Sequence, residues 1–134
     1  MYDNWKIKKW ETPVSDWKWL FMDSLTDSAK THTLEILLSD KDDYPQIAIQ
    51  FKNYPIYRNI VEEYRTTLWN HLSKTSQWCG WTFEVVNSPW LEKLCKIEPL
   101  IEVHDSGLRH FVISTNDDVI EVLSNLEPNI EKVV

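Results

Sequence analysis

The stretch RHFVISTNDDVIEVL, residues 109–123, decides the fold of this chain. Two runs rich in β-branched and aromatic residues, 109–114 and 119–123, flank a short polar segment. β-branched residues favour strands, and an Asn/Asp-rich segment between two such runs is typical of a turn. The pattern therefore predicts a β-hairpin. A helix beginning near Asn116 is the competing interpretation, because the apolar residues from 119 to 126 also fit a helical stripe.

The surrounding third of the chain, residues 98–134, is strongly acidic. It holds eight acidic and two basic residues, which is a net charge of −6 out of −7 for the whole protein. The apolar runs within it indicate a folded segment rather than a disordered tail. The 134 residues are 43% hydrophobic and 13% aromatic, so we expect one globular domain, 1–134, with a substantial core.

Other segments show either the two-residue period of strands or the longer period of helices. Apolar residues at every second position predict strands, and a polar loop ending in Pro45 joins two of these strands into a hairpin. The five expected strands are 17–22, 33–38, 46–52, 81–86 and 100–103, with a turn at 26–28.

Two segments have helical signals. An i, i+3, i+4 stripe predicts an amphipathic helix over 57–73, with Arg58 and Glu62 paired on its other side. Ser88 as cap and Pro89 as first residue predict a shorter helix over 89–97. We therefore expect an α+β fold: a mostly antiparallel sheet of about five to seven strands, the main helix on one face and the short helix at an edge.

Composition excludes several functional classes. Only two glycines are present, which excludes a Gly-rich phosphate loop, and the two cysteines do not make a disulfide framework. No secretory signal or membrane-spanning apolar run is visible, so a cytoplasmic protein without membrane contact is expected. The acidic balance argues against nucleic-acid binding and permits the opposite, a basic protein partner or a mimic of nucleic acid.

No catalytic, cofactor or metal motif is found. Cys79 and Cys95 lack the spacing of zinc ligands, and so do His104 and His110. A calcium loop counted from Asp40 would need Gly and Glu where the chain has proline and phenylalanine. Both cysteines are interpreted as packing residues, and no serine is expected at a strand–turn–helix junction that would expose a nucleophile.

His110 and the nearby acids are the ionisable residues of most interest. His110 should share a face with Val112 and is interpreted as a structural histidine held by a neighbouring carboxylate; a role in a pocket is the alternative. Asp117, Asp118 and Glu121 form the densest acidic group. A charged turn plus an edge-strand charge that blocks aggregation explains them most simply, and paired-carboxylate catalysis is the alternative.

Part of the second half carries a resemblance. Its segments FEVVNSPWL at 83–91, RHFVI at 109–113 and DDVIEVL at 117–123 together cover under half of the chain. In these segments the chain resembles small uncharacterised bacterial proteins of toxin-immunity type. The resemblance implies a small, non-enzymatic α+β protein that inhibits a partner toxin, and it carries over no catalytic residues.

Three functional hypotheses follow. The first is a non-catalytic protein-binding module of immunity type with a basic partner. The second is a small-molecule-binding or enzymatic domain with a Trp-lined pocket that involves His110 or the acidic pairs, and the third is an obligate homo-oligomer. For the first hypothesis the candidate contact residues are Asp40, Asp42, Asp43, Tyr44, Asp117, Asp118 and Glu121.

Overall fold

The computed structural model describes residues 4–41, 45–53, 55–75, 77, 80–104 and 107–133, and it is an α+β protein with two antiparallel sheets. The five-stranded sheet has the order β1–β6–β7–β8–β5: β1 (Lys6–Lys9), β6 (Thr82–Val86), β7 (Arg109–Ser114), β8 (Asp118–Ser124) and β5 (Ile56–Val61). The four-stranded sheet has the order β2–β3–β4–β9: β2 (Phe21–Ser28), β3 (Thr33–Ser39), β4 (Gln46–Phe51) and β9 (Asn129–Val133).

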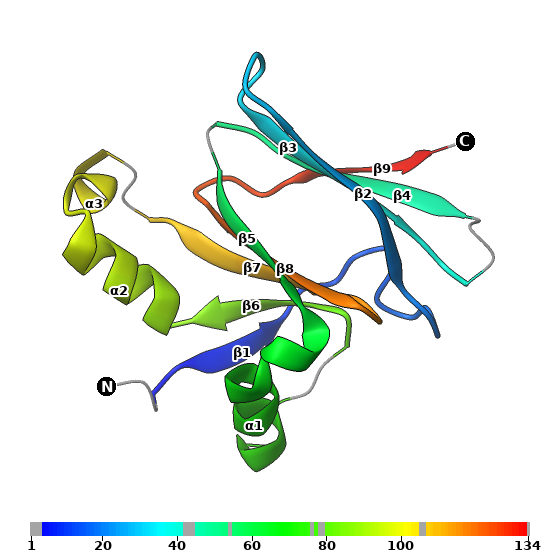
Figure 1. Ribbon diagram of the computed structural model, residues 1–134, viewed down its shortest axis with the longest axis horizontal. Coiled ribbons are helices and arrows are strands. Elements are labelled where there is room, and N and C mark those ends of the chain that lie inside the picture. Colours follow the sequence, from blue (N-terminus) through cyan, green and yellow to red (C-terminus); the bar gives the residue numbers. More distant parts are fainter. Residues whose placement is uncertain are drawn as a thin grey trace.

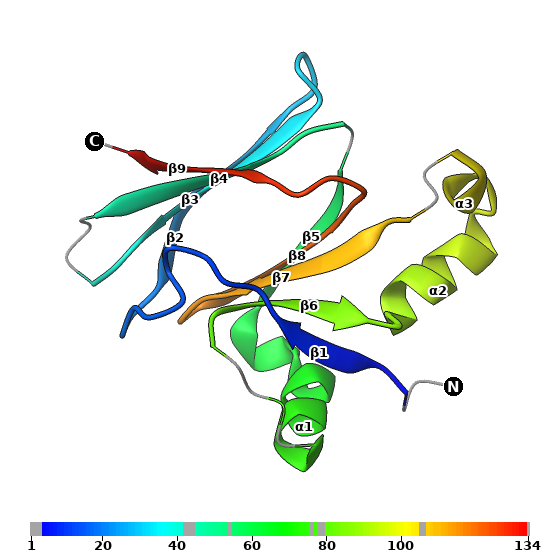
Figure 2. The same ribbon diagram turned by 180° about the vertical axis from the view of Figure 1, so that it is seen from behind.

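Three helices and one 3-10 turn complete the described residues: η1 (Glu62–Tyr64), α1 (Thr66–Thr75), α2 (Pro89–Ile97) and α3 (Leu100–His104). The helices lie beside the five-stranded sheet, away from the four-stranded one (Figures 1 and 2). No described helix has the length and apolar character that crossing a membrane requires.

The five-stranded sheet has a core on each of its faces. On one face, Phe111 and Ile120 pack with residues of the four-stranded sheet such as Ile36 and Phe51. On the other face, Val112 and Val119 pack with residues that include Leu68 and Leu72 of α1. Burial on both faces explains why β7 and β8 read as continuous apolar runs rather than as alternating ones.

The hairpin at 109–123 is confirmed. β7 and β8 pair antiparallel, with Phe111 opposite Val122 and Val112 opposite Glu121. At the turn, the Thr115 amide donates to the Asp118 carbonyl at 2.8 Å. The hairpin of β3 and β4 is also present, as predicted, and so is the helix at 89–97. The competing helix near Asn116 is excluded.

The predicted helix over 57–73 is wrong in its first part. Residues 56–61 form β5, which pairs with β8, and the α-helix begins only at Thr66, after the 3-10 turn η1. The first part is β-branched and aromatic, and a strand partner supplied by β8 outweighs its helical stripe. As a result Arg58 faces Glu121 across the sheet instead of Glu62 along a helix.

Smaller corrections concern the other elements. The expected strand at 100–103 is the short helix α3, the expected turn at 26–28 lies inside β2, and β2 begins only at Phe21. β9 was not expected, and the strands divide into two sheets rather than one. The expected sheet of five to seven strands thus becomes nine described strands, still entirely antiparallel in their pairing.

The junction between β6 and α2 fixes the position of the site. Asn87 adopts a left-handed conformation with φ of 58°, which asparagine tolerates better than most residues. The chain thereby turns directly from the strand into the helix. The Ser88 hydroxyl accepts a hydrogen bond from the Leu91 amide at 3.1 Å, and Pro89 begins the helix, as expected.

Candidate functional site

The centre of the candidate site is Glu121, a carboxylate in the middle of the five-stranded sheet with no exposed surface. Arg58 of the neighbouring β5 donates from Nε and Nη2 at 3.0 Å each. Arg65, which follows η1, donates from the same two nitrogens at 2.9 and 3.2 Å. Two guanidiniums therefore share one carboxylate, which compensates the cost of burying its charge. We call these three residues, together with His110 and Ser88, the Glu121 cluster.

His110 links Glu121 to the start of α2. Its Nε2 lies 2.9 Å from Glu121 Oε1, and its Nδ1 lies 2.7 Å from Ser88 Oγ. Because Ser88 Oγ already accepts from the Leu91 amide, its own proton is free to be donated to Nδ1. Nε2 then carries the ring proton and donates to Glu121. The hydrogen bonds are complete with a neutral imidazole.

The pKa values of this pair are consistent with that arrangement. Burial lowers the pKa of His110 below its ordinary 6.5, opposed by Glu121 and reinforced by the charges of Arg58 and Arg65. Burial acts to raise the pKa of Glu121, but hydrogen bonds from His110 and Arg58 and the charge of Arg65 lower it to about 2. Glu121 is thus ionised and His110 neutral at pH 7, so the cluster carries a net charge of about +1.

Trp90 encloses one side of the cluster. Its ring meets the His110 ring edge-on with centroids 5.2 Å apart, and the Arg58 guanidinium lies 4.1 Å from its centre. Trp90 is the first residue after the proline of α2. The capped helix start therefore positions both the hydroxyl and the aromatic ring against the sheet.

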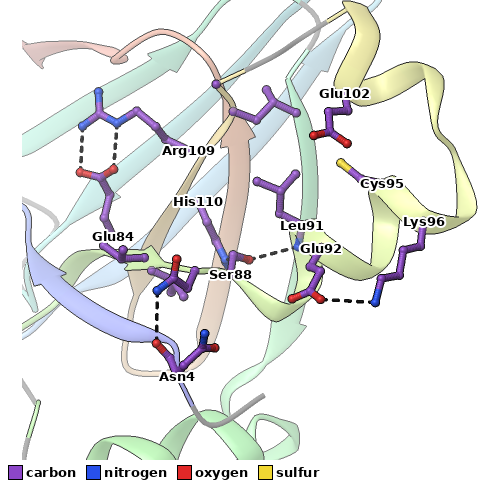
Figure 3. A pocket seen from close by; sticks show the side chains of 15 residues that line it. Asn4, Glu84, Ser88, Leu91, Glu92, Cys95, Lys96, Glu102, Arg109 and His110 are labelled. Carbon is purple, nitrogen blue, oxygen red and sulfur yellow. Dashed lines mark hydrogen bonds and ion pairs between the residues drawn. The ribbon is translucent and has the colours of Figure 1, made fainter. Parts of the chain in front are cut away.

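A cavity of about 680 Å³ opens beside the cluster, between β6, β7, α2 and α3. Ser88, His110 and Leu91 line it, and Cys95 and Glu102 face each other across its helical side (Figure 3). Burial and the charge of Glu102 raise the pKa of the Cys95 thiol, so it stays protonated at neutral pH. A smaller cavity of about 360 Å³, lined by Trp69 and Trp81, lies elsewhere and does not include His110.

A second arginine group lies at the rim of the larger cavity. Arg109 Nε and Nη2 donate to Glu84 at 2.8 Å each, and Nη2 also reaches Glu127 at 3.3 Å (Figure 3 shows the pair with Glu84). The hydrogen bond from Arg109 lowers the pKa of Glu84 and outweighs burial. Here two carboxylates share one guanidinium, the reverse of the Glu121 cluster. We call these three residues the Arg109 group.

The chain Ser88–His110–Glu121 has the connectivity of a hydrolase triad, but it is not poised as one. A general base must become an imidazolium, and burial with two nearby guanidiniums disfavours that cation. Ser88 is only 7% exposed and its oxygen is engaged by the helix start. The arrangement is better suited to holding β5, β7, β8 and α2 together than to transferring a proton.

The candidate contact residues that were predicted from the sequence do not form one group in the structure. Glu121 is wholly buried in an internal strand, so it is neither a partner contact nor an edge-strand charge. Asp117 is exposed at the β7–β8 turn. Burial of Asp118 and the negative charge of Asp117 raise the pKa of Asp118. Asp40 is partly buried at the end of β3. The remaining candidates, Asp42, Asp43 and Tyr44, lie outside the described residues.

His110 does line a cavity and is held by a carboxylate, but none of the tryptophans that the structure describes lines that cavity. Sequence reasoning missed Arg58, Arg65 and Ser88 as members of the cluster. Ser88 lies between β6 and α2 as the expected helix cap, but its hydrogen bond to His110 was not predicted. The signal for Arg58 was present: had 56–61 been recognised as a strand beside β8, its pairing with Glu121 would have followed.

No protein-family model matches the chain, and no curated protein or solved structure matches it significantly. Within the described residues, no group of three or more His, Cys, Asp or Glu side chains could hold a metal ion.

Proposed function

We propose that this protein is a non-catalytic protein-binding module whose outer sheet face contacts a basic partner, with an immunity-type inhibitor as the specific form of that role. The single observation that carries the proposal is the charge of the outward face of β2–β3–β4–β9. Its three charged positions are all acidic: Asp23, Glu35 and Glu131. Within these described strands, no Lys or Arg occupies an outward position.

The outward positions follow from the pairing register. Leu34, Ile36 and Leu38 of β3 point into the core, so the alternate residues of β3 and their partners point out. Besides the three acids, most of them are short, hydrogen-bonding side chains, for example Thr26, Gln50 and Asn129. The helices lie away from this sheet, and so leave its face uncovered (Figure 2).

Such a face suits a basic protein partner. Carboxylates on a surface of one sign raise the association rate of a positively charged partner, and salt screens the effect. Asp23 is already ordered, because it accepts from Ser39 at 2.8 Å and from Gln46 at 2.7 Å. Asp40, which directly follows β3, is a further carboxylate at one end of this sheet.

The experiment is affinity capture from the source organism at low salt, followed by titration of the captured protein against designed variants. The triple variant Asp23→Asn, Glu35→Gln, Glu131→Gln neutralises the face. The control Asp16→Asn, Glu63→Gln, Glu98→Gln removes the same charge from exposed residues elsewhere. We expect the control to bind as the wild type does, and the face variant to bind at least tenfold more weakly.

Two results would contradict the proposal. One is capture of nothing basic at low salt, and the other is equal weakening by the face variant and its control. Urea unfolding of both variants establishes that a loss of binding is not a loss of fold.

A small-molecule ligand is the second candidate function, favoured by the cavity of about 680 Å³ beside His110. Replacing Leu91 by tryptophan would fill that cavity and abolish thermal stabilisation by such a ligand.

A homo-oligomer is favoured by the exposed apolar residues Ile97, Leu100 and Val103, which are 63%, 66% and 72% exposed. Light scattering that finds a monomer at micromolar concentration would exclude it.

A further inference from the structure

The Glu121 cluster has more cationic donors than its one carboxylate can use. Glu121 accepts five hydrogen bonds, two from each arginine and one from His110, whereas a carboxylate offers about four lone-pair sites. With His110 neutral, two guanidiniums face one negative charge. The carboxylate is saturated, and one positive charge remains in excess.

Several N–H groups of both arginines remain unused. A guanidinium has five N–H donors, and Glu121 engages two from each arginine. Neither arginine has a further hydrogen bond or ion pair in the part of the chain that the structure describes. The Nη1 nitrogen of each arginine makes none of these bonds and reaches solvent, because no buried side-chain nitrogen or oxygen of the described residues lacks a partner.

The two guanidiniums are held in place before any ligand arrives. Both bind the same two oxygens of Glu121, so they lie close together, and Trp90 packs against Arg58 at 4.1 Å. Their side chains are 31% and 15% exposed, so each is partly withdrawn from water. Ordered donors bind an anion without the entropy cost of ordering flexible side chains.

We propose that Arg58 and Arg65 form an oxyanion-binding site, which takes a carboxylate or a phosphate group on the side of their guanidiniums away from Glu121. The planar fork of arginine matches both groups and donates two parallel hydrogen bonds to either. The excess positive charge supplies attraction in a protein whose net charge is −7. The site is separate from the acidic sheet face, so each proposal can fail without the other.

The test uses 15N-labelled wild-type protein and observes the arginine Nε–Hε and tryptophan indole resonances. Sodium phosphate and sodium acetate are titrated separately, with sodium chloride holding the ionic strength constant. We expect saturable shifts at Arg58, Arg65 and Trp90 with at least one of the anions, and the anion that binds more tightly identifies the group. Arg109 is the internal control, because two carboxylates already neutralise it.

Two outcomes overturn the inference. The first is the absence of saturable shifts with both anions, and the second is an equal response at Arg109, which would indicate general screening. Arg58→Lys retains the charge but loses the fork, and should weaken binding roughly tenfold, while Arg109→Lys should leave it unchanged. If Arg58→Lys proves unfolded, the wild-type titration decides alone.

Discussion

The Glu121 cluster and the Arg109 group use the same ion pair in opposite proportions. In the first, two guanidiniums surround one carboxylate that is wholly buried; in the second, two carboxylates share one guanidinium whose side chain is 35% exposed. The first sits on the helix-covered face of the sheet, the second on the face that packs toward the other sheet.

This difference shows that burial determines how much stability is lost when one charge of a pair is removed. An exposed pair gains little, because water and salt screen it. A buried pair also contributes little net stability when intact, but removing one member leaves a desolvated charge without compensation. The two groups should therefore respond very differently to the same substitution.

Removing the shared carboxylate should give the largest effect. Glu121→Gln leaves two partly buried guanidiniums without an anion and should lower the free energy of unfolding by about 3–5 kcal/mol. The matched change Glu84→Gln should cost about 1 kcal/mol, because Glu127 still neutralises Arg109. Urea unfolding measures both, and equal losses would show that burial does not separate the two groups.

Removing one arginine should cost less than removing Glu121. Arg65→Met leaves a balanced pair of Arg58 and Glu121 and should lower the unfolding free energy by about 2 kcal/mol. Arg58→Met should cost less than Arg65→Met, because Arg58 is the more exposed. A double-mutant cycle with Glu121→Gln would show whether the arginines couple to that carboxylate. A more costly Arg58 change would reverse the expected order.

Acid should weaken the fold through His110 first. Since burial lowers the pKa of His110 in the folded protein, the unfolded chain binds the proton first as the pH falls below 6.5. Stability is therefore lost on going from pH 7 to pH 5, with a slope from this group of at most about 1.4 kcal/mol per pH unit. Glu121 adds a further loss between its ordinary 4.5 and about 2.

The check on that pH dependence is thermal unfolding from pH 7 to pH 5. His110→Gln should flatten the profile, whereas His32→Gln, at an exposed position, should leave it unchanged. A profile that keeps its slope in His110→Gln would place the responsible proton elsewhere.

The smallest effect should come from the hydroxyl at the helix start. Ser88→Ala removes the cap of α2 and the donor to His110, and should cost about 1 kcal/mol. The 15N spectrum of the imidazole provides a sharper readout. In the wild type Nε2 should carry the proton. The variant should keep this tautomer because Glu121 still accepts from Nε2, but its Nδ1 resonance should shift on loss of the Ser88 donor. A wild type protonated at Nδ1 would contradict the assigned hydrogen bonds.

Much of the fold could be predicted because local signals agreed with their tertiary setting. The 109–123 hairpin, the β3–β4 hairpin and the capped helix at 89–97 each have a turn or cap signal beside a clear apolar pattern. Residues 57–61 failed because their apolar spacing fits two periods, and only the partner strand β8 decides between them. β9 was missed because its pairing with β4 is remote in sequence.

The candidate site could be predicted only in part, for the same reason. His110 could be assigned to a carboxylate, since one face of a hairpin brings nearby residues together. Arg58, Arg65 and Ser88 come from three other segments, and only their packing on the sheet brings them to Glu121. An exposed role for Glu121 was expected because an acidic residue is normally exposed. The sequence did not show which cations would compensate its charge.

The strand order also has a kinetic consequence. Some neighbouring strands in each sheet are far apart along the chain: Ile7 pairs with Val85, Asn59 with Ile120, and Ile49 with Ile130. Each of these pairings must close a long loop, and its contacts offset the entropy cost of closure only after the loop has closed. The hairpins β3–β4 and β7–β8 can form early, whereas both sheets are completed late. This protein should therefore fold slowly for its size, with open sheet edges exposed while it does so.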